Sequence, residues 1–537
     1  MFKSRRFFVF LIVILGFFLY FHSLKDTFVW DDEEQILANT AVHSLTDWPT
    51  FFTGSTFNNG GASTSLMGLY YKPLMTFSFA ILYAMFGLIP FYFHLFQLVI
   101  HITNAILVFL IFYYLFKALL GHKAHLAGVL GPAAAGSLIF LVHPLLTEAV
   151  VYSASLQDVL FTFFGLLAFL IVVKGHKLER FFAVAFLLLL SLLSKETGVV
   201  FFAIILTYVL IFRKKDESIA FVLAAFLSVG FYAFMRFGVA HIGLQKQNLS
   251  PISRAGFAER MQTVPEIIFY YVSRFFWPSS LAISQHFIVP KIDFSGFFAP
   301  AAFDLVFFIV LACGYFLINR NDRSSGKLYI FFFLWFVFAL GIHLQIFPLD
   351  MTVADRWFYL PMIGLIGCIG VILKDYINLT SVKIILVIIV AVMSVRTFTR
   401  TLDWKDGLTL FGHDERIVKN SFDLENNLGV ELFRAGRFAE AKSHFEASAR
   451  LAPYWWTNWN NLGAIAERQG DFSKAENDYK KAIKNGKYYL AVENLATLLI
   501  RVKKYAEAKK FLQDTAIPNF PDNAIIQNDY LYLQNLK

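Results

Sequence analysis

Charged residues and cysteine are both scarce in this sequence of 537 residues. Only 16% of the residues are charged, against about a quarter in ordinary soluble domains, which excludes a typical soluble enzyme. The two cysteines, Cys313 and Cys368, lie inside apolar runs, so a disulfide framework and a cysteine-based metal site are excluded as well. Hydrophobic residues make up 57% of the chain, and the mean hydropathy is +0.58. This composition predicts an all-α protein that crosses a lipid bilayer several times.

A net charge of +9 would also suit a protein that binds nucleic acid. The basic residues, however, are clustered beside apolar runs, which is where cytoplasmic anchors of membrane helices are found. Membrane topology therefore explains the charge, and no nucleic-acid partner is expected.

About eleven apolar segments are expected to be transmembrane helices, since each is near the length that a bilayer needs. They are 7–21, 91–116, 125–143, 156–173, 179–194, 197–212, 218–235, 300–318, 328–347, 357–373 and 381–398. Two further amphipathic stretches, 69–88 and 264–289, are expected to be interfacial helices on the outer face.

Basic clusters precede the first apolar segment and recur in every second loop. They are Lys3, Arg5 and Arg6; Lys117 and Lys123; Lys174, Lys177 and Arg180; Arg213, Lys214 and Lys215; Arg320, Arg323 and Lys327; and Lys374 and Lys383. The positive-inside rule therefore places the N-terminus in the cytoplasm and the C-terminus outside. The expected setting is a bacterial inner membrane with the C-terminal part in the periplasm, or the endoplasmic reticulum membrane in a eukaryote.

The sequence turns polar after about residue 400, and a period of about 34 residues appears. Leu428-Gly429 recurs as Leu462-Gly463, Gly436 recurs as Gly470, and a weaker third copy carries Leu495-Ala496. This pattern is typical of tetratricopeptide repeats, which are stacked helical hairpins. It predicts a membrane domain over 1–400, with a first outer loop at 23–90, and about three repeats over 401–537.

Stacked repeats present a concave surface that usually holds a protein or peptide. A folded outer cap without a partner is the alternative. Trp455, Trp456 and Trp459 fall at a junction between repeats, where they are expected to serve packing and not sugar binding.

Four consecutive carboxylates, Asp31-Asp32-Glu33-Glu34, follow Trp30 directly after the first apolar segment. The topology places them outside. Two acids beside a tryptophan at the membrane surface indicate a reactive site, and a solvated flank of the first helix is the alternative. Glu33 and Glu34 are expected to belong to the solvated start of a following helix.

Other polar side chains of the predicted outer loops are expected on the same face, where ionisable groups usually serve a site. They are Lys72, His143, Glu148, Gln157, Asp158, Lys195, Glu196, Arg274, Ser284, His286, Asp350, Asp355, Arg356 and Tyr359. The alternatives are a hydrogen-bonded pair of His143 with Glu148 and self-neutralised ion pairs at 195–196 and 355–356.

Carboxylates that face outward beside cations suit a lipid-phosphate sugar donor. Arg and Lys bind the phosphate and stabilise the negative charge that it gains as it leaves, and a carboxylate activates the acceptor hydroxyl. No His or Cys spacing indicates a metal site.

The motifs also occur in a recognisable order. They are Trp30-Asp31-Asp32; Tyr71-Lys72-Pro73-Leu74; Phe93-His94-Leu95; His143-Pro144-Leu145-Leu146-Thr147-Glu148; Leu193-Ser194-Lys195-Glu196; and Asp355-Arg356-Trp357-Phe358-Tyr359-Leu360-Pro361. With the repeats that follow, the chain resembles the transmembrane and tetratricopeptide-repeat O-mannosyltransferases and their bacterial relatives. These belong to the GT-C superfamily of glycosyltransferases that use polyprenyl-phosphate sugars. Asp355 stands where the family is expected to carry Glu, and the animal members carry more repeats, which favours a bacterial protein.

The resemblance implies a GT-C membrane fold and a catalytic base at Asp31 or Asp32. It implies that the donor phosphate is bound by Arg356 and Lys195, with Lys72 and His143, and that Glu148, Glu196, Arg274, His286 and Tyr359 support the site. It favours catalysis without a cofactor or metal, although it leaves a divalent cation at the acidic pair open.

The expected function is that of an inverting glycosyltransferase, which moves one sugar from a polyprenyl or dolichyl phosphate to an acceptor hydroxyl. The repeats would hold the acceptor protein or glycan. One alternative is a ligase or polymerase of lipid-linked oligosaccharides, against which the short outer loop at 348–356 argues. The other is a membrane-anchored assembly factor without enzymatic activity.

Overall fold

The computed structural model describes residues 4–56, 70–121, 126–175, 179–243, 250–486, 488–521 and 523–536. Within these ranges the chain is helical and forms no strand; a single isolated bridge joins Gln285 to Val353. The all-α prediction is therefore confirmed. Lys3, Lys123 and Lys177, and part of the first outer loop, 57–69, lie outside the described residues.

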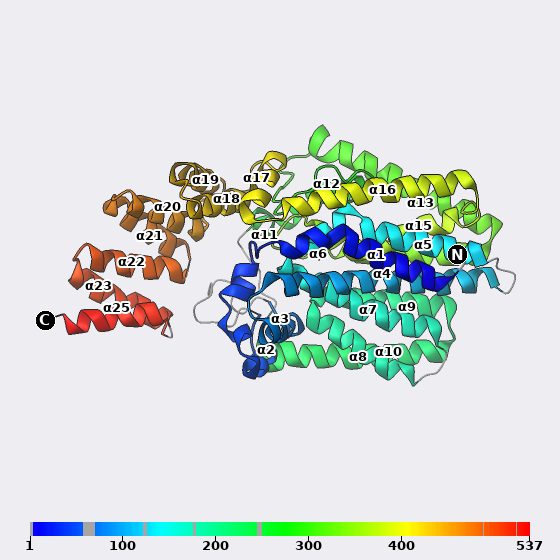
Figure 1. Cartoon of the computed structure of the whole chain (residues 1–537), viewed down its shortest axis with the longest axis horizontal. Helices are drawn as coiled ribbons and strands as arrows, with labels where there is room; N and C mark the ends of the chain where they lie inside the picture. Colours follow the sequence, from blue (N-terminus) through cyan, green and yellow to red (C-terminus); the bar gives the residue numbers. More distant parts are fainter. Residues whose placement is uncertain are drawn as a thin grey trace.

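Long helices run side by side along the long axis of the molecule, and a smaller helical domain extends from one end of this bundle (Figure 1). The bundle helices are α1 (Arg5–Tyr20), α4 (Pro90–Leu120), α5 (Leu126–Val142), α6 (Thr147–Val151), α7 (Leu156–Lys174), α8 (Arg180–Ser194), α9 (Val200–Phe212), α10 (Lys215–Ala233), α13 (Ala299–Asn321), α14 (Arg323–Gly341), α15 (Tyr359–Leu373) and α16 (Thr380–Asp403). Further helices at the end near the smaller domain are α2 (Trp48–Thr53), α3 (Pro73–Phe86), α11 (Pro251–Arg254) and α12 (Phe257–Phe276).

Each predicted apolar segment is helical, but fewer of these helices are long enough to span a membrane than was expected. Among the described residues, 8 helices have the length and composition of a span, or up to 9 if a bent pair counts as one. The bent pair breaks by 52° between Val142 and Pro144, because proline lacks an N–H and restricts the residue before it. Helices α8 and α9 are apolar but shorter, since the chain is extended at Lys195 between them. The interfacial position of α3 and α12 stays a prediction.

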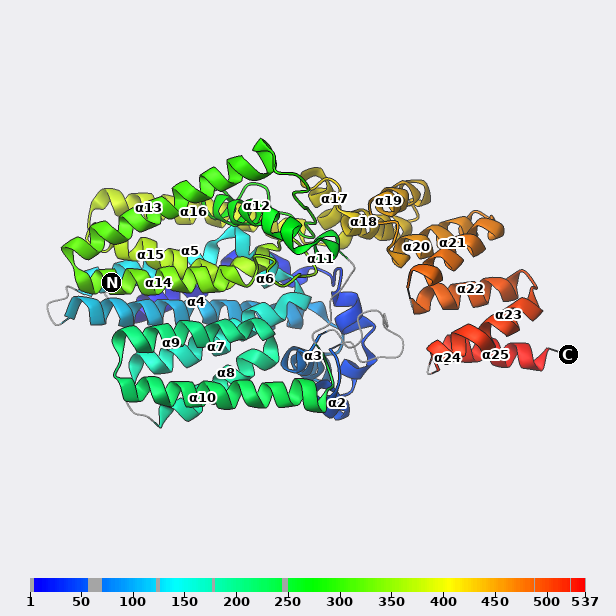
Figure 2. The same ribbon diagram turned by 180° about the vertical axis from the view of Figure 1, so that it is seen from behind.

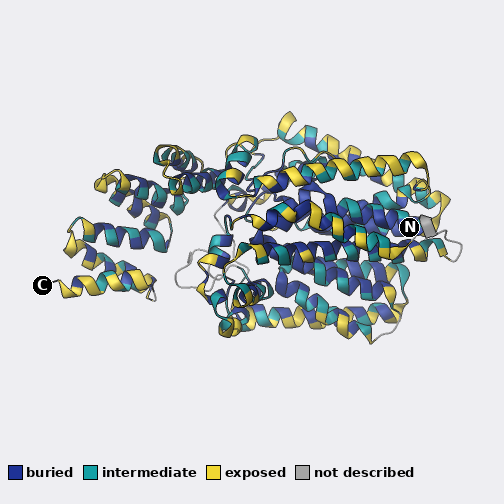
Figure 3. Cartoon of the chain, viewed as in Figure 1, coloured by how far each residue is buried: buried dark blue, intermediate teal, exposed yellow. Residues whose placement is uncertain are grey.

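The outer faces of several bundle helices are exposed (Figure 3), and the side chains on them are largely apolar. In the most apolar window of α16 only 6% of the residues are buried, and in that of α13 only 11%. Their exposed side chains include Leu305, Phe316, Val387 and Val395. Apolar surface of this extent is stable in contact with lipid and not with water, so the chain is a multi-pass membrane protein.

Basic side chains gather at the end of the bundle that carries the N-terminus. Arg5 lies over the ring of Tyr113, and Lys174 lies over the neighbouring Tyr114. At the same end, the guanidinium of Arg213 donates to the backbone carbonyls of Val172 and Val173, both at 2.8 Å. The smaller domain and the acidic stretch lie at the opposite end (Figures 1 and 2).

The smaller domain is a row of helical hairpins that follows a linker helix, α17 (Gly407–Ile417). The hairpin helices are α18 (Phe422–Arg434), α19 (Phe438–Leu451), α20 (Trp456–Arg468), α21 (Phe472–Asn485), α22 (Tyr489–Arg501) and α23 (Tyr505–Phe511), before α24 (Ile517–Asn519) and α25 (Ala524–Asn535). A side chain at Gly463 would place its Cβ 2.6 Å from the ring of Tyr479, so only glycine lets these two helices close. Gly436 and Gly470 turn the chain with φ of 76° and 78°, which explains why both glycines recur.

Candidate active site

A cavity of about 530 Å³ lies where the bundle meets the first repeats. Three residues predicted from the sequence to be functional line it from the bundle side: Asp31, Lys72 and Arg356. His286 also lines it, together with Trp30, Tyr70, Tyr152, Gln157 and Asp350. The repeats contribute residues of α18, α20 and α22 to the opposite wall. The cavity is therefore built by both domains.

The two adjacent aspartates have different environments. Asp32 is 0% exposed and does not line the cavity. Its Oδ1 accepts the backbone N–H of Ala154 at 2.6 Å, and its Oδ2 accepts that of Val29 at 3.1 Å. Oδ1 thus fastens the acidic loop to the turn that precedes α7, while Oδ2 closes the loop on itself. Asp31, which is half-buried, lines the cavity, so only Asp31 can reach a bound substrate.

The backbone at Trp30 orients this loop. Trp30 has a φ of 55°, an unusual conformation for a bulky residue, and its ring stacks on that of Tyr152 with the centroids 5.5 Å apart. Tyr152 packs in turn against Trp404 at the end of α16, at 5.7 Å. Tyr152 is thus packed between Trp30 and Trp404, and it holds the strained Trp30 in place, as is typical of a functional site.

Burial raises the pKa of Asp31 above its usual value. Arg356, Tyr152 and Lys72 lower the pKa of this carboxyl, while the charge of Asp350 raises it. A carboxylate of raised pKa that remains near cations is a better proton acceptor than a solvated one.

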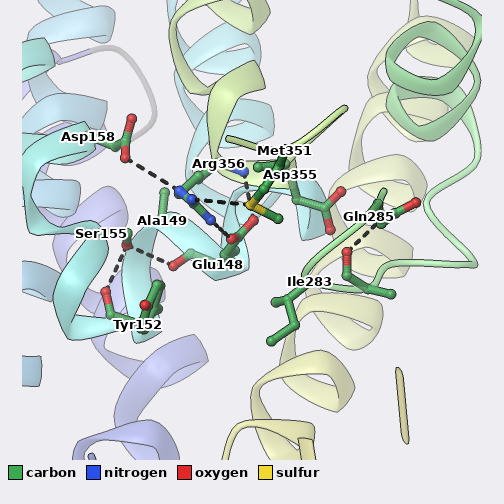
Figure 4. A network of polar contacts seen from close by, with 12 residues as sticks. Glu148, Ala149, Tyr152, Ser155, Asp158, Ile283, Gln285, Met351, Asp355 and Arg356 are labelled. Carbon is green, nitrogen blue, oxygen red and sulfur yellow. Dashed lines mark hydrogen bonds and ion pairs between the residues drawn. The ribbon is translucent and has the colours of Figure 1, made fainter. Parts of the chain in front are cut away.

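Arg356 is held by carboxylates behind the cavity wall (Figure 4). Its backbone N–H donates to Oε2 of Glu148 at 3.0 Å, and its guanidinium pairs with Oε1 of the same residue. Oδ2 of Asp158 lies 3.9 Å from Nε. The bend between α5 and α6 brings Glu148 to this position. The guanidinium is therefore fixed in orientation while it faces the cavity.

Lys72 faces the cavity without a carboxylate of its own. Its side chain is buried, and Nζ lies 4.3 Å from the centre of the Tyr70 ring. In the described part of the chain, no carboxylate is within ion-pair distance of Nζ. Burial lowers the pKa of Lys72 to about 8, although the charge of Glu196 opposes this shift. An anion bound beside Lys72 would relieve the cost of its burial.

Lys195 and Glu196 lie behind this wall and do not line the cavity. Nζ of Lys195 pairs with Oδ1 of Asp158 at 2.6 Å, and Glu196 pairs with Arg236 at 3.6 Å. Asp158 therefore links Lys195 to Arg356. The alternative considered for these neighbours, an ion pair between 195 and 196, does not form, because each has a partner on another helix.

Three other predicted site residues lie away from the cavity. Nε2 of His143 contacts the carbonyl of Phe275 at 3.0 Å, and Nδ1 accepts the N–H of Leu145 at 3.2 Å, so both ring nitrogens are engaged. The hydroxyl of Tyr359 contacts Nδ1 of His101 at 2.8 Å inside the bundle. Arg274 lies over the ring of Tyr270 at 4.7 Å. The structure thus does not bring these side chains to the acids.

The structure bears on two expectations about the acidic stretch and the tryptophans. Glu33 begins a short helix, Glu33–Leu37, as expected, but it is only partly solvated, because its carboxylate pairs with the guanidinium of Arg434 on α18. Glu34 lines the cavity, and burial together with Asp31 and Glu33 raises its pKa to about 7. Trp455 and Trp456 also line the cavity, besides packing between repeats.

The sequence did not single out several residues that the geometry makes important. Nothing in the sequence marks Tyr152 as a site residue, because its role depends on stacking against the ring of Trp30, which lies far away in the sequence. Asp158 and Asp350 stood among many polar residues of the outer loops; Asp350 accepts the hydroxyl of Tyr70 at 3.1 Å. Asp423 joins the domains, since its Oδ2 contacts Nε2 of His286 at 2.8 Å.

No group of three or more His, Cys, Asp or Glu side chains that could hold a metal ion occurs among the described residues. Whether a divalent cation binds at the acidic pair therefore stays open to experiment.

Comparison with known proteins gives the same family that the motifs indicate. The tetratricopeptide repeat family model matches residues 456–486. Protein O-mannosyl-transferase F38B6.6 of Caenorhabditis elegans is 24% identical over 447 residues, which are 82% of this chain and 62% of that protein. Protein O-mannosyl-transferase TMTC3 of Homo sapiens is 24% identical over 525 residues, 91% of this chain and 55% of that protein.

A shorter match is closer in sequence. Protein O-mannosyl-transferase TMTC1 of Mus musculus is 32% identical over 202 residues, which are 35% of this chain and 20% of that protein. The predicted resemblance to the transmembrane and tetratricopeptide-repeat O-mannosyltransferases is thus confirmed. The chain spans less than two thirds of the length of each of these relatives.

Proposed function

We propose that this chain is a membrane-bound glycosyltransferase that moves a single sugar, mannose by analogy with its relatives, from a polyprenyl phosphate to a hydroxyl of a protein acceptor. The observation that supports it most is the cavity in which Asp31 lies with two cations, Arg356 and Lys72. This set provides one proton acceptor and two groups that bind a phosphate. The names of the relatives support the sugar and the acceptor class.

The proposed reaction is a single displacement. Asp31 takes the proton of the acceptor hydroxyl as its oxygen attacks the anomeric carbon of the sugar. The bond from that carbon to the phosphate oxygen breaks, and the phosphate leaves with the electron pair. Arg356 and Lys72 stabilise its added negative charge. Attack from the face opposite the phosphate inverts the configuration at the anomeric carbon.

The cavity lies at the end of the bundle away from the basic cluster of Arg5, Lys174 and Arg213. Under the positive-inside rule this is the outer end, which is periplasmic in a bacterium and lumenal in the endoplasmic reticulum. Helices that border the lipid reach this end, so a polyprenyl chain can remain in the bilayer while its phosphate enters the cavity.

The direct test replaces each aspartate by asparagine in the purified full chain, with polyprenyl-phosphate mannose labelled in the sugar and a protein acceptor. Asp31→Asn should lower transfer by about 10²–10⁴-fold, because a general base contributes that much. Donor binding, measured separately, should persist. Wild-type transfer by a folded Asp31→Asn variant would exclude the proposed base.

The variant of the adjacent aspartate, Asp32→Asn, tests whether Asp32 has a structural role. Since both oxygens of Asp32 accept backbone N–H groups, this change should destabilise the acidic loop and lower the midpoint of thermal unfolding. Asp31→Asn should leave that midpoint unchanged or raise it, because it removes a buried charge.

A further inference from the structure

A continuous chain of asparagine side chains runs along the repeats. Its members are Asn426 and Asn427 on α18, Asn460 and Asn461 on α20, and Asn494 on α22. Nδ2 of Asn461 donates to Oδ1 of Asn426 at 2.8 Å, and Nδ2 of Asn494 donates to Oδ1 of Asn460 at 2.9 Å. Within each pair the amides contact at 3.5 and 3.3 Å. We name this set the asparagine ladder.

The asparagine ladder is in register with the repeats and reaches the cavity. Asn426, Asn427 and Asn461 line the same cavity as Asp31, while Asn460 and Asn494 continue it to the next repeat. Each member lies on the first helix of its hairpin. A chain that lies along the ladder would therefore lead directly to the proposed base.

The ladder keeps unused hydrogen-bonding capacity. A primary amide has two N–H donors and an oxygen with two lone pairs, and the contacts between the asparagines use only part of these. Nδ2 of Asn427 is buried and has no hydrogen-bond partner within the described chain, although the residue lines the cavity. A buried donor without a partner is unfavourable, and a ligand carbonyl that accepted this N–H would relieve the cost.

The chemistry of the ladder matches a polypeptide main chain. Its groups are uncharged and offer a donor and an acceptor side by side, as a peptide unit does. The acids beside it are Glu33, Glu34, Asp423 and Glu431. Arg434 is shared by Glu33 and Glu431, and Asp423 contacts His286, so this wall stays net negative and disfavours an acidic ligand. The surface therefore fits a neutral or basic extended peptide.

A glycan is the competing ligand, but the rings of the two tryptophans that the repeats contribute to the cavity wall, Trp455 and Trp456, are already engaged. Trp455 packs edge to face against Phe422 with the centroids 4.9 Å apart, and the ring of Trp456 covers Gly486 so closely that a Cβ there would lie 2.3 Å from it. Sugar platforms need exposed ring faces. The aromatic residues therefore favour the peptide.

We propose that the asparagine ladder binds the main chain of an extended, non-acidic acceptor polypeptide and delivers one of its hydroxyl side chains to Asp31. This inference rests on the proposed transferase function, because that function explains why the bound polypeptide leads toward Asp31. Binding of the polypeptide itself does not require the sugar donor. Recognition through the main chain makes binding nearly independent of the side chains, apart from the hydroxyl and the charge.

The test measures binding of a labelled, unstructured peptide of alanine, glycine and threonine to the purified full chain without donor. The double change Asn427→Ala and Asn461→Ala should weaken binding about thirtyfold, since each of the two lost hydrogen bonds is worth about 1 kcal/mol. Asn477→Ala, on the exposed face of α21, is the matched control and should bind as wild type. The isosteric Asn427→Asp should weaken binding without a change in size.

Three further binding measurements distinguish main-chain recognition from side-chain recognition and from catalysis. Methylation of alternate peptide nitrogens should abolish binding, and replacing alanine by valine should change it little. Asp31→Asn should bind the peptide as wild type, which separates this inference from the proposed catalysis. The inference is overturned if the wild-type chain does not bind the peptide, if the ladder variants bind it equally well, or if free mannose oligosaccharides displace it.

Discussion

At the scale of single residues, two groups of the cavity differ in pKa from their usual values in opposite directions. Burial raises the pKa of Asp31 and lowers that of Lys72 to about 8. The carboxylate must be charged to accept a proton, and the ammonium must be charged to bind phosphate. The site is therefore competent only between the two pKa values.

This difference predicts the pH profile of transfer. Activity at low donor concentration should rise with pH as Asp31 ionises and fall again near pH 8, as Lys72 loses its proton. In Lys72→Arg the alkaline fall should move to higher pH, because guanidinium stays charged. Lys72→Met should bind donor about ten- to a hundredfold more weakly, the worth of a charged hydrogen bond.

The control is Lys195→Arg, since Lys195 pairs with Asp158 and does not line the cavity. Its alkaline limb should stay in place. An unchanged alkaline limb in Lys72→Arg would show that another group binds the phosphate.

At the scale of secondary-structure elements, close approach of helices depends on a few glycines. In the second repeat α20 and α21 meet at Gly463 against Tyr479, as Gly429 meets Phe445 in the first repeat. The spacing of these glycines made the repeats predictable from the sequence, because each repeat needs the same small residue at the same place.

Gly463→Val should destabilise the repeats by about 1–3 kcal/mol, because the added atoms overlap the Tyr479 ring. Gly412→Ala in α17 should instead stabilise by about 0.5–1 kcal/mol, since a Cβ there meets no atom within 4 Å. Thermal unfolding of the full chain followed by circular dichroism measures both. Equal midpoints for Gly463→Val and wild type would mean that the two helices do not pack this closely.

Some site residues could be found from the sequence and others could not, for a physical reason. Hydropathy and charge place a loop at one end of the bundle, and they grouped Asp31, Lys72 and Arg356, which do line one cavity. They do not say which way a side chain turns. His143 and Tyr359 turn inward to satisfy backbone and side-chain partners, and the backbone at Ala154 withdraws Asp32 from the cavity.

At the scale of the whole molecule, the cavity exists only where the two domains meet. His286 contacts Asp423, and Glu33 contacts Arg434, so the bundle and the first repeat are joined on two sides of the cavity. The backbone N–H of Ile283 also donates to Asp414 of α17 at 2.8 Å. The acceptor surface and the proposed base are thereby held in one frame, and both must lie on the same side of the membrane.

That arrangement makes the membrane side testable with one reporter. Alkaline phosphatase, which is active only outside the cytoplasm, should be active in a bacterium when fused after Lys405, at the cavity end of α16. Lys374 lies at the opposite end of the bundle near Asp322, since its charge lowers the pKa of that carboxyl. Fused after Lys374, the phosphatase should be inactive. The reason is that the basic clusters hold their end in the cytoplasm. Activity after Lys374 and none after Lys405 would reverse the orientation and place the cavity, with its donor phosphate, on the cytoplasmic face.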